Sequence, residues 1–440
     1  MSFPRYPKYK PSGVEWLGDV PEGWDVVPFK HRCSRYALYG ANMSSDEYVT
    51  DGVRFLRTTD ISESGELEPD GVFVSTEVAR EYLLKDKDIL ISRSGTIGRA
   101  FVFAADVHPE CAYAGYLVRF VPTKQLNSRL FFYFTKSAAF SDWLQTQLIF
   151  STIGNVNGQK YAQCRLPLPP LPEQTAIAEF LDRETGKIDG LVAEQRRLME
   201  LLKEKRQAVI SHAVTKGLNP HAPMKPSGIE WLGEVPEHWG VGALGYFSKI
   251  SSGSTPDRDT PAYWGGDIPW VKTGEVNYST ITHTEETISK EALALCAVSL
   301  AKPGTVLMAL YGQGVTRGRV AILGVASAFN QACAAISPDR RISSRFLHAL
   351  FVCAYEFIRG IGNETTQMNL NLDFVRRFRV LLPPMEEQTA IVEFLDGEIL
   401  KFDALTAEAQ RAIDLLQERR TALISAAVTG QIDVRQHPKN

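Results

Sequence analysis

The sequence predicts an α+β protein in which two mixed α/β globular regions are separated by two long antiparallel helices that form a coiled coil. Two repeats within the 440 residues point to this fold. A segment at 166–215 recurs without a gap at 380–429, and a tryptophan-containing segment at 10–24 recurs at 225–239. Copies at a fixed spacing indicate a tandem duplication. The expected order is therefore globular region, long helix, globular region, long helix.

Each copy of the long repeat is predicted to be one helix. Prolines open it at 169–170 and 383–384, and a Glu-Gln pair then places negative charge where the helix dipole favours it. An alternating four–three step of mostly apolar positions predicts a coiled-coil seam, and two ordinary core helices are the alternative. About 40 residues at 1.5 Å each would span roughly 60 Å. The expected seam positions are Ile177, Leu181, Glu184, Ile188, Leu191, Gln195, Leu198, Leu202, Lys205 and Val209 in the first copy, and Ile391, Leu395, Glu398, Phe402, Leu405, Ala409, Ala412, Leu416, Arg419 and Leu423 in the second.

Charged residues interrupt both expected seams at matching places. Glu184 and Glu398 are carboxylates, while Lys205 and Arg419 are bases. One antiparallel register brings Glu184 near Arg419 and Lys205 near Glu398, whereas parallel helices would place like charges together. The sequence therefore predicts antiparallel helices joined by these two opposite-charge pairs.

The globular regions diverge, but short elements in them still match. Two β-rich runs around a glycine-containing loop predict a hairpin within 88–103 and another within 305–323. A short helix with a serine cap is expected at 128–135 and again at 343–350. Each region therefore mixes strands with a few helices.

A polar loop closes each globular region, at 151–158 in the first and at 365–371 in the second, and one strand then leads into the prolines. The tryptophans of the shorter repeat are expected to be packing residues: Trp16, Trp24, Trp231 and Trp239. The expected boundaries are 1–165 for the first globular region, 166–220 for the first helical segment, 221–379 for the second globular region and 380–434 for the second helical segment.

Composition restricts the class of protein. No apolar run approaches the roughly 18 residues needed to span a bilayer, and the first ten residues lack the apolar core of a signal peptide. Six cysteines form no CxxC pair, which is typical of free thiols in a reducing cytoplasm. The formal net charge of −3 lacks the basic excess of many nucleic-acid binders, so any such contact must come from local patches or from a partner.

Motifs of catalysis are missing from the sequence. There is no GxxxxGK[ST] to hold a nucleotide phosphate, no GxGxxG that opens a helix after a strand, and no HExxH. The Pro-Pro pairs follow leucine, so they differ from the Asn- or Asp-Pro-Pro-aromatic segment of amino-methyltransferases. The acidic residues at 257–259 resemble only part of a nuclease site. The sequence therefore predicts no catalytic site, no metal site and no cofactor of its own.

The repeats resemble those of a known family. The motifs PPLPEQTAIAEFLD at 169–182 and PPMEEQTAIVEFLD at 383–396, with GVEWLGDVPEGW at 13–24 and GIEWLGEVPEHW at 228–239, resemble the specificity subunit of type I restriction-modification systems. This resemblance covers essentially the whole chain. It implies two target-recognition domains, each of which reads one half of a bipartite, asymmetric site in double-stranded DNA.

The same resemblance implies the partners. The helices would space the two domains and dock two methyltransferase subunits, and restriction/translocase subunits would join through the complex. Those partner subunits would use S-adenosylmethionine, ATP and Mg²⁺, whereas this chain would be a non-catalytic, cytoplasmic subunit with no membrane contact.

Candidate DNA-binding residues are the polar side chains of the glycine-containing and polar loops. Arginine can bind guanine through two hydrogen bonds, and asparagine or glutamine can bind adenine in the same way. The alternative is that these residues cap turns and face solvent. The candidates are Arg93, Ser94, Thr96, Arg99, Asn155, Asn157, Lys160, Lys272, Tyr311, Gln313, Thr316, Arg317, Arg319, Gln367, Asn369 and Asn371.

A duplicated coiled-coil adaptor that binds only protein partners is the rival function. The nearly neutral charge favours this adaptor slightly. Divergence of the globular regions beside nearly identical helices disfavours it, because an adaptor has no need of two different faces.

Overall fold

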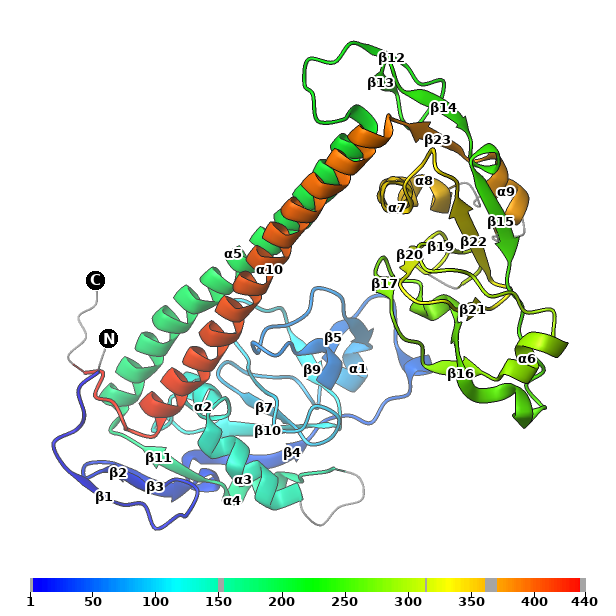
Figure 1. The fold of residues 1–440 in the computed structure, drawn as a ribbon. Coiled ribbons are helices and arrows are strands. Elements are labelled where there is room, and N and C mark those ends of the chain that lie inside the picture. The colour runs from blue at the N-terminus through cyan, green and yellow to red at the C-terminus, as the bar shows by residue number, and fades with distance from the viewer. Residues whose placement is uncertain (1–2, 149–153, 313–314, 361–369, 436–440) are drawn as a thin grey trace. The chain divides into compact units, whose positions relative to one another are not determined.

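The computed structural model describes residues 3–148, 154–312, 315–360 and 370–435. The chain divides into two compact units, one made of Met1–Arg196 with Gln410–Asn440 and the other of Arg197–Ala409 (Figure 1). Each unit holds a mixed α/β globular part and a stretch of both long helices, α5 (Leu171–Lys216) and α10 (Met385–Val428). The predicted α+β class and its tandem order are confirmed.

The first unit is built on a four-stranded antiparallel sheet of order β4-β10-β7-β8. A three-stranded sheet of order β6-β5-β9 and the pairs β1-β2 and β11-β3 complete it. Its strands are β1 (Tyr9–Pro11), β2 (Asp19–Pro21), β3 (Asp25–Pro28), β4 (Cys33–Tyr39), β5 (Val53–Leu56), β6 (Val72–Val74), β7 (Ile89–Ser92), β8 (Ala100–Val102), β9 (Cys111–Tyr113), β10 (Leu117–Pro122) and β11 (Arg165–Leu168). Its shorter helices are α1 (Thr76–Ala79), α2 (Ser128–Phe134), α3 (Ala138–Leu148) and α4 (Gly158–Gln163).

The second unit repeats this plan, with a five-stranded sheet of order β15-β22-β19-β20-β17 and a three-stranded sheet of order β18-β16-β21. Its strands are β12 (Met224–Pro226), β13 (Glu234–Pro236), β14 (Gly240–Ala243), β15 (Ser248–Ser252), β16 (Trp264–Val271), β17 (Thr280–Ile281), β18 (Glu286–Ile288), β19 (Val306–Ala309), β20 (Val320–Leu323), β21 (Ala328–Phe329), β22 (Cys333–Pro338) and β23 (Arg379–Leu382). Its shorter helices are α6 (Lys290–Leu295), α7 (Ser344–Cys353), α8 (Tyr355–Gly360) and α9 (Leu372–Arg377).

The pairing of strands confirms both predicted hairpins. β7 pairs antiparallel with β8, and β19 pairs antiparallel with β20. In each unit a parallel pair, β5-β9 or β16-β21, ties distant parts of the chain together. The predicted short helices are α2 and α7, although the serine cap is wrong for α2, because the side chain of Asn127 accepts the N–H groups of Arg129 and Leu130. Ser343 stands at the N-cap of α7 without a side-chain bond.

A short helix follows each polar loop, which the sequence did not predict. The helices are α4 and α9, and the side chains of Asn157 and Asn371 cap their first turns. Six residues are too few for a hydrophobic period to be recognised. The strand expected after each loop is present as β11 or β23, and each of these strands pairs antiparallel with the strand that follows the shorter repeat.

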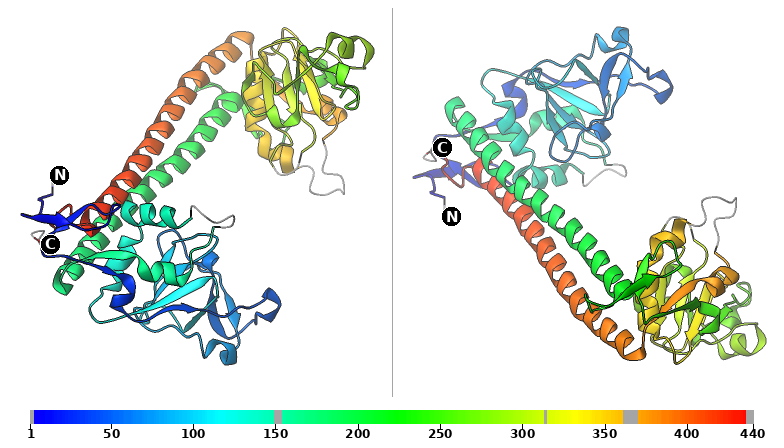
Figure 2. Two further views of the ribbon diagram at one scale, coloured as in Figure 1. Left: turned by 90° about the horizontal axis from the view of Figure 1, so that it is seen from below. Right: turned by 90° about the horizontal axis from the view of Figure 1, so that it is seen from above.

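The long helices run antiparallel, as predicted, and lie side by side in Figures 1 and 2. In the core of the first unit the start of α5, with Ile177 and Leu181, packs with the end of α10, at Ile424. In the core of the second unit the end of α5, at Ile210, packs with the start of α10, at Ile391. Opposite ends of two continuous helices therefore meet within each unit.

The seam between the helices has a different phase from the predicted one. Thr185 and Val192 are buried, whereas Leu191 is 47% exposed, Leu198 is 43% exposed and Leu405 is 48% exposed. The assignment of these three leucines to the seam was therefore wrong. A four–three and a three–four step share every second position, so the periodicity alone does not distinguish them.

Ion pairs join the helices in both units through residues other than those predicted. Arg420 Nε lies 2.8 Å from Asp189 Oδ1 in the first unit. Arg206 Nη1 lies 2.8 Å from Asp403 Oδ1 in the second. The two arginines occupy equivalent positions of the duplicated helix, and so do the two aspartates. Opposite charges therefore support the antiparallel order with one register in both units.

The predicted pairs of Glu184 with Arg419 and of Lys205 with Glu398 are wrong. Glu184 bonds Lys187 of its own helix at 2.9 Å, and this bond lowers the pKa of Glu184. Lys205 and Arg419 are exposed. They lie one step outside the seam, because the true seam passes through the residue that follows each of them.

The two repeated motifs contact each other within each unit. The Trp24 indole N–H donates to Glu173 over 3.1 Å, and the Trp239 indole N–H donates to Glu387 over 3.0 Å. Both tryptophans are buried, as predicted. The glutamine that follows each glutamate is also buried, and its side chain binds three backbone groups. The motifs thus fix the globular part of each unit onto its helices.

Candidate nucleic-acid interface

Arg93 and Asn155 come together at one end of the first unit's sheet. Arg93 follows β7, and its Nε lies 3.4 Å from Asn155 Oδ1. Its guanidinium also lies 5.1 Å from the ring centroid of Tyr39 on β4. Arg93 is half-buried and Asn155 is exposed, so this part of the predicted set forms one surface cluster.

The remaining candidates of the first unit lie in the same loop or in α4. Thr96 is exposed and Ser94 is half-buried, whereas Arg99 donates to the carbonyl of Ile61 over 2.7 Å. The side chain of Asn157 caps α4 by accepting the backbone N–H of Lys160. The ammonium of Lys160 donates to the carbonyl of Gln147 over 3.0 Å. Asn157 and Lys160 therefore have local structural roles whether or not DNA is bound.

The positive charge of Arg99 also acts on Lys136, a lysine that sequence reasoning missed. Lys136 follows α2, and its ammonium donates to the carbonyl of Glu63 over 2.7 Å. Burial, aided by the charge of Arg99, lowers the pKa of Lys136 to about 8. A depressed lysine pKa depends on packing, so no sequence pattern marks it.

We expect the free energy of unfolding to rise between about pH 8 and about pH 10, because the unfolded chain still binds the proton that folded Lys136 has lost. Lys136→Met should abolish this part of the rise. Chemical unfolding of both proteins at pH 8 and pH 10 measures it. The same increment in both proteins would contradict the assignment to Lys136.

The hairpin loop of the second unit is less open than its glycines suggested. Tyr311 is 38% exposed, but Arg317 is only 8% exposed, and its Nη2 donates to the carbonyl of Arg359 over 2.6 Å. The candidate Arg317 is therefore buried rather than exposed. The start of α8 covers the loop, where Tyr355 donates to the carbonyl of Val315. Glycine marks a tight turn without deciding whether the turn faces solvent.

The other candidates of the second unit are divided among several places. Thr316 is half-buried in the hairpin loop. Arg319 Nη1 lies 3.0 Å from Asn277 Oδ1, and Asn371 caps α9. Lys272 lies apart from the hairpin, at the end of β16, where it pairs with two glutamates. Gln313, Gln367 and Asn369 lie outside the described residues.

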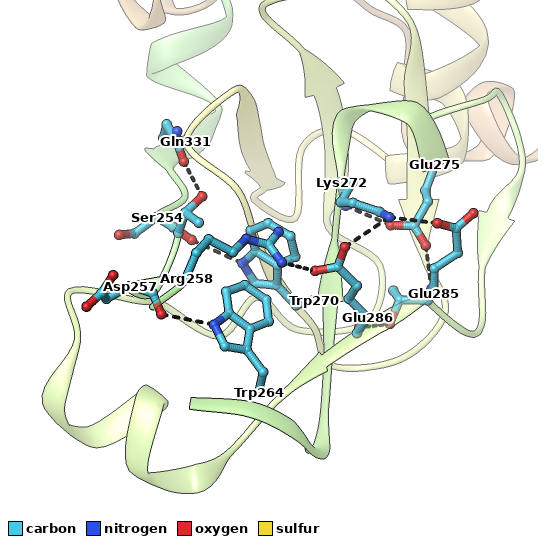
Figure 3. A network of polar contacts seen from close by, with 12 residues as sticks. Ser254, Asp257, Arg258, Trp264, Trp270, Lys272, Glu275, Glu285, Glu286 and Gln331 are labelled. Atoms are coloured by element: carbon cyan, nitrogen blue, oxygen red, sulfur yellow. Dashed lines mark hydrogen bonds and ion pairs between the residues drawn. The ribbon is translucent and has the colours of Figure 1, made fainter. Parts of the chain in front are cut away.

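A hollow of about 550 Å³ beside Lys272 includes residues that the sequence analysis did not select. Arg258 lies with its guanidinium carbon 3.8 Å from the ring centroid of Trp264 and 4.9 Å from that of Trp270 (Figure 3). From the sequence, the acidic residues at 257–259 resemble only part of a nuclease site, and Arg258 is not among the candidates. Interleaved arginine and tryptophans between glycines were the signal that could have found it.

The first unit has a hollow of about 450 Å³ at the equivalent place. Both hollows are lined by the residues that follow the matched strands β5 and β16, Arg57 in one unit and Lys272 in the other. Beside each hollow, a glycine backbone lies close to a neighbouring strand. A Cβ atom added to Gly40 would lie 2.0 Å from the carbonyl oxygen of Tyr113, and a Cβ atom added to Gly253 would lie 2.1 Å from the carbonyl oxygen of Phe329. The duplication therefore kept the hollow and changed its lining.

Over the described residues, no group of three or more His, Cys, Asp or Glu side chains could hold a metal ion. In the same part of the chain, no helix is long and apolar enough to cross a membrane. The cysteines there are free, and burial raises the pKa of Cys333 to about 12.

Comparison with known families gives one match that covers most of the chain. The type I restriction modification DNA specificity domain matches residues 45–195 and 236–414. Two similar proteins are the EcoKI specificity subunit of Escherichia coli K12 and the StySPI specificity subunit of Salmonella potsdam. Each is 22% identical, over 96% of this chain and 92% of its own length.

Solved structures show a related fold. A chain from work on complex assembly and conformational transition of the type I R-M system superimposes with a TM-score of 0.67. It is 16% identical, over 94% of this chain and 99% of its own. The HsdS subunit from Thermoanaerobacter tengcongensis superimposes with a TM-score of 0.55 over 94% of this chain and 98% of its own, again at 16% identity.

Proposed function

The chain belongs to the family of the type I restriction modification DNA specificity domain, and from this premise we propose that it is the DNA-specificity subunit of a type I restriction-modification complex. One observation carries the proposal: the main sheets of the two units share the order of four matched strands, β4-β10-β7-β8 and β15-β22-β19-β20, but the units present different polar side chains. A scaffold that must read two different DNA half-sites needs this combination. The chain itself would be non-catalytic.

We assign the reading of DNA to the two globular regions, 1–165 and 221–379, each of which would bind one half of a bipartite, asymmetric site. Support comes from the arginine–asparagine cluster at Arg93 and from the hairpin loop at Tyr311, because such side chains bind base edges and phosphates. The helical segments 166–220 and 380–434 would space the regions.

Exposed leucines on the helices support docking of two like partners. Leu191 and Leu405 occupy equivalent positions of the duplicated helix, and so do Leu201 and Leu415. All four are 47–65% exposed. Exposed apolar side chains that recur by duplication are suited to bind two copies of the same subunit. We propose that these partners are methyltransferase subunits, which would use S-adenosylmethionine, and that restriction/translocase subunits with ATP and Mg²⁺ join them.

The test of this function is an exchange of recognition regions. We expect that replacing residues 30–165 by the matching region of a relative will change one half of the methylated site and leave the other half intact. Methylome sequencing of cells that carry the hybrid and its partner subunits measures this. Changes in both half-sites would contradict the modular assignment, and the unmodified chain serves as control.

Docking of the partner should depend on the exposed leucines. Leu405→Glu and Leu191→Glu should each weaken capture of the methyltransferase subunit by about 1.5–3 kcal/mol, the range for burial of one leucine. Leu300→Glu is the matched control, because Leu300 is 46% exposed and lies outside the helices. Titration of tagged partner onto purified chain measures the affinity. Equal binding by all three variants would remove this surface from the interface.

A protein-only adaptor is the second candidate, and the absence of a basic excess favours it. A filter-binding assay with random duplex, with and without a co-expressed methylating subunit, separates the two functions. An adaptor would retain no DNA in either condition.

A further inference from the structure

Arg258 lines the hollow in the second unit and lies within a network of polar contacts (Figure 3). Its guanidinium stacks on Trp264, whose indole N–H donates to the carbonyl of Asp257 over 3.0 Å. Trp270 packs edge-on against Trp264 and close to the Arg258 guanidinium, and its indole N–H donates to the carbonyl of Ser254 over 3.1 Å. Two indole bonds thus fasten the loop that carries Arg258.

An ion pair with Glu286 further restrains the orientation of the Arg258 guanidinium. The Arg258 Nη1 lies 2.5 Å from Glu286 Oε2, and Glu286 also accepts from Lys272 at 3.1 Å. These two bonds lower the pKa of Glu286, with the Arg258 bond as the larger cause. Only Nη1 of Arg258 has a protein acceptor among the described residues, and its side chain is 51% exposed. The other donors of its planar fork are therefore free for a ligand.

Charge around the hollow argues against a simple phosphate site. Lys272 is neutralised by Glu285 at 2.6 Å and by Glu286. Arg258 shares Glu286, and Glu275 also lines the hollow, so the two cations face three carboxylates. A phosphate would meet no excess of positive charge, whereas a base edge with both donors and acceptors would meet complementary groups.

A buried acceptor at the same hollow also lacks a partner. Among the described residues no donor bonds the buried Oδ1 of Asn330, and Asn330 lines the hollow. Its neighbour Gln331 accepts from Thr255, which also lines the hollow. An unsatisfied buried carbonyl favours a ligand that brings an N–H group. Arginine donors and an amide acceptor together match the mixed edge of a base pair rather than an anion.

A backbone hydrogen bond links the segment after the lining residue Asn330 to the loop already assigned to DNA. Ala332, two residues after Asn330, accepts from the N–H of Leu310, and the hairpin loop begins at Tyr311. The first unit repeats this neighbourhood, since Tyr116 lines its hollow and accepts from the N–H of Arg93. In each unit, a backbone bond thus connects the chain at the hollow to the loop proposed to face DNA.

We propose that Arg258 is a specificity-determining residue that binds the O6 and N7 atoms of a guanine in the half-site read by the second unit. The inference rests on the proposed function and deepens it. Trp264 and Glu286 act as positioning residues, which hold the guanidinium plane so that its free donors point outward. The fork of arginine matches the two acceptors that guanine presents in the major groove.

The experiment uses the full chain with its partner subunits. Arg258→Lys keeps the positive charge but removes the planar pair of guanidinium donors. Glu286→Gln removes the charge that restrains the Arg258 guanidinium. Arg340→Lys is the control, because Arg340 is an exposed arginine of the same unit. Binding is measured to the cognate duplex, found by methylome sequencing, and to duplexes with each base pair of the half-site changed in turn. Thermal unfolding confirms that each variant is folded.

Arg258→Lys should lower discrimination at one G·C pair by about 5- to 150-fold and leave the other positions unchanged. Glu286→Gln should lower it at the same pair by less, and Arg340→Lys should not. Equal weakening on every sequence, with a salt slope reduced by about one, would show a phosphate contact and overturn the proposal. Unchanged discrimination by folded Arg258→Lys would leave only a structural stack and overturn it as well. An unaltered complex with no sequence preference would instead refute the proposed function.

Discussion

Arg119→Met should lower the free energy of unfolding of the first unit by about 3–5 kcal/mol, because it leaves a buried carboxylate without its partner. Arg119 Nη2 lies 2.5 Å from Asp88 Oδ2, and their side chains are 8% and 1% exposed. Arg119 also donates to the carbonyl of Leu83 over 2.9 Å. The pair joins the central strand β10 to the residue before β7, so its loss destabilises the middle of the sheet.

The loss should depend on pH in a defined direction. Burial already raises the pKa of Asp88, and removal of the guanidinium would raise that pKa further. When the pKa of a carboxyl group is higher in the folded protein than in the unfolded chain, the free energy of unfolding falls as pH rises above the unfolded pKa. Arg119→Met should therefore be more destabilised at pH 8 than at pH 5. Urea unfolding at the two values measures the difference.

The second unit supplies the matched control. Its sheet has Thr305 and Ala335 at the places of Asp88 and Arg119, and both are buried without an ion pair. The double variant Asp88→Thr/Arg119→Ala should therefore recover more than half of the loss. A double variant as unstable as Arg119→Met would show that lost packing, rather than the unpaired charge, dominates.

Duplication is the reason that so much of the fold could be predicted. Two copies of each motif fixed the order of elements, and both hairpins lie where glycine turns separate β-rich runs. The prediction of which residues form the seam was wrong in phase because Leu191 is more apolar than Val192, although Val192 is the residue that is buried. Hydrophobicity cannot distinguish a leucine that packs inside the chain from one that is left exposed.

Residues of the candidate site could be predicted only where they lie close together in the sequence. Arg93 lies in a loop that joins adjacent strands, so a sequence window contains it. Arg258, Trp270 and Glu286 meet because β16 pairs with β18, with Trp270 directly opposite Glu286. Parallel pairing of β16 with β21 then brings Asn330 to the same hollow. Such pairings over long separations have no signature in a local pattern.

Trp239→Ala should lower the free energy of unfolding of the second unit by about 3–5 kcal/mol, the range for a large aromatic removed from a core. Trp239 is fully buried and packs edge-on against Phe346 at 6.4 Å. Gly217 makes room for it, because a Cβ there would lie 3.2 Å from the indole ring. The ring therefore fills the joint between the end of α5 and the globular part.

The indole N–H adds a polar component that can be separated from volume. Trp239→Phe keeps most of the apolar ring but leaves Glu387 without that donor, so we expect a loss of about 1.5–3 kcal/mol. Trp231→Ala is the matched control, since Trp231 belongs to the same repeat but is only half-buried against Phe357. Urea unfolding followed by near-UV circular dichroism measures all three. An unchanged free energy of unfolding in Trp239→Phe would mean that the Trp–Glu contact does not hold the two repeated motifs together.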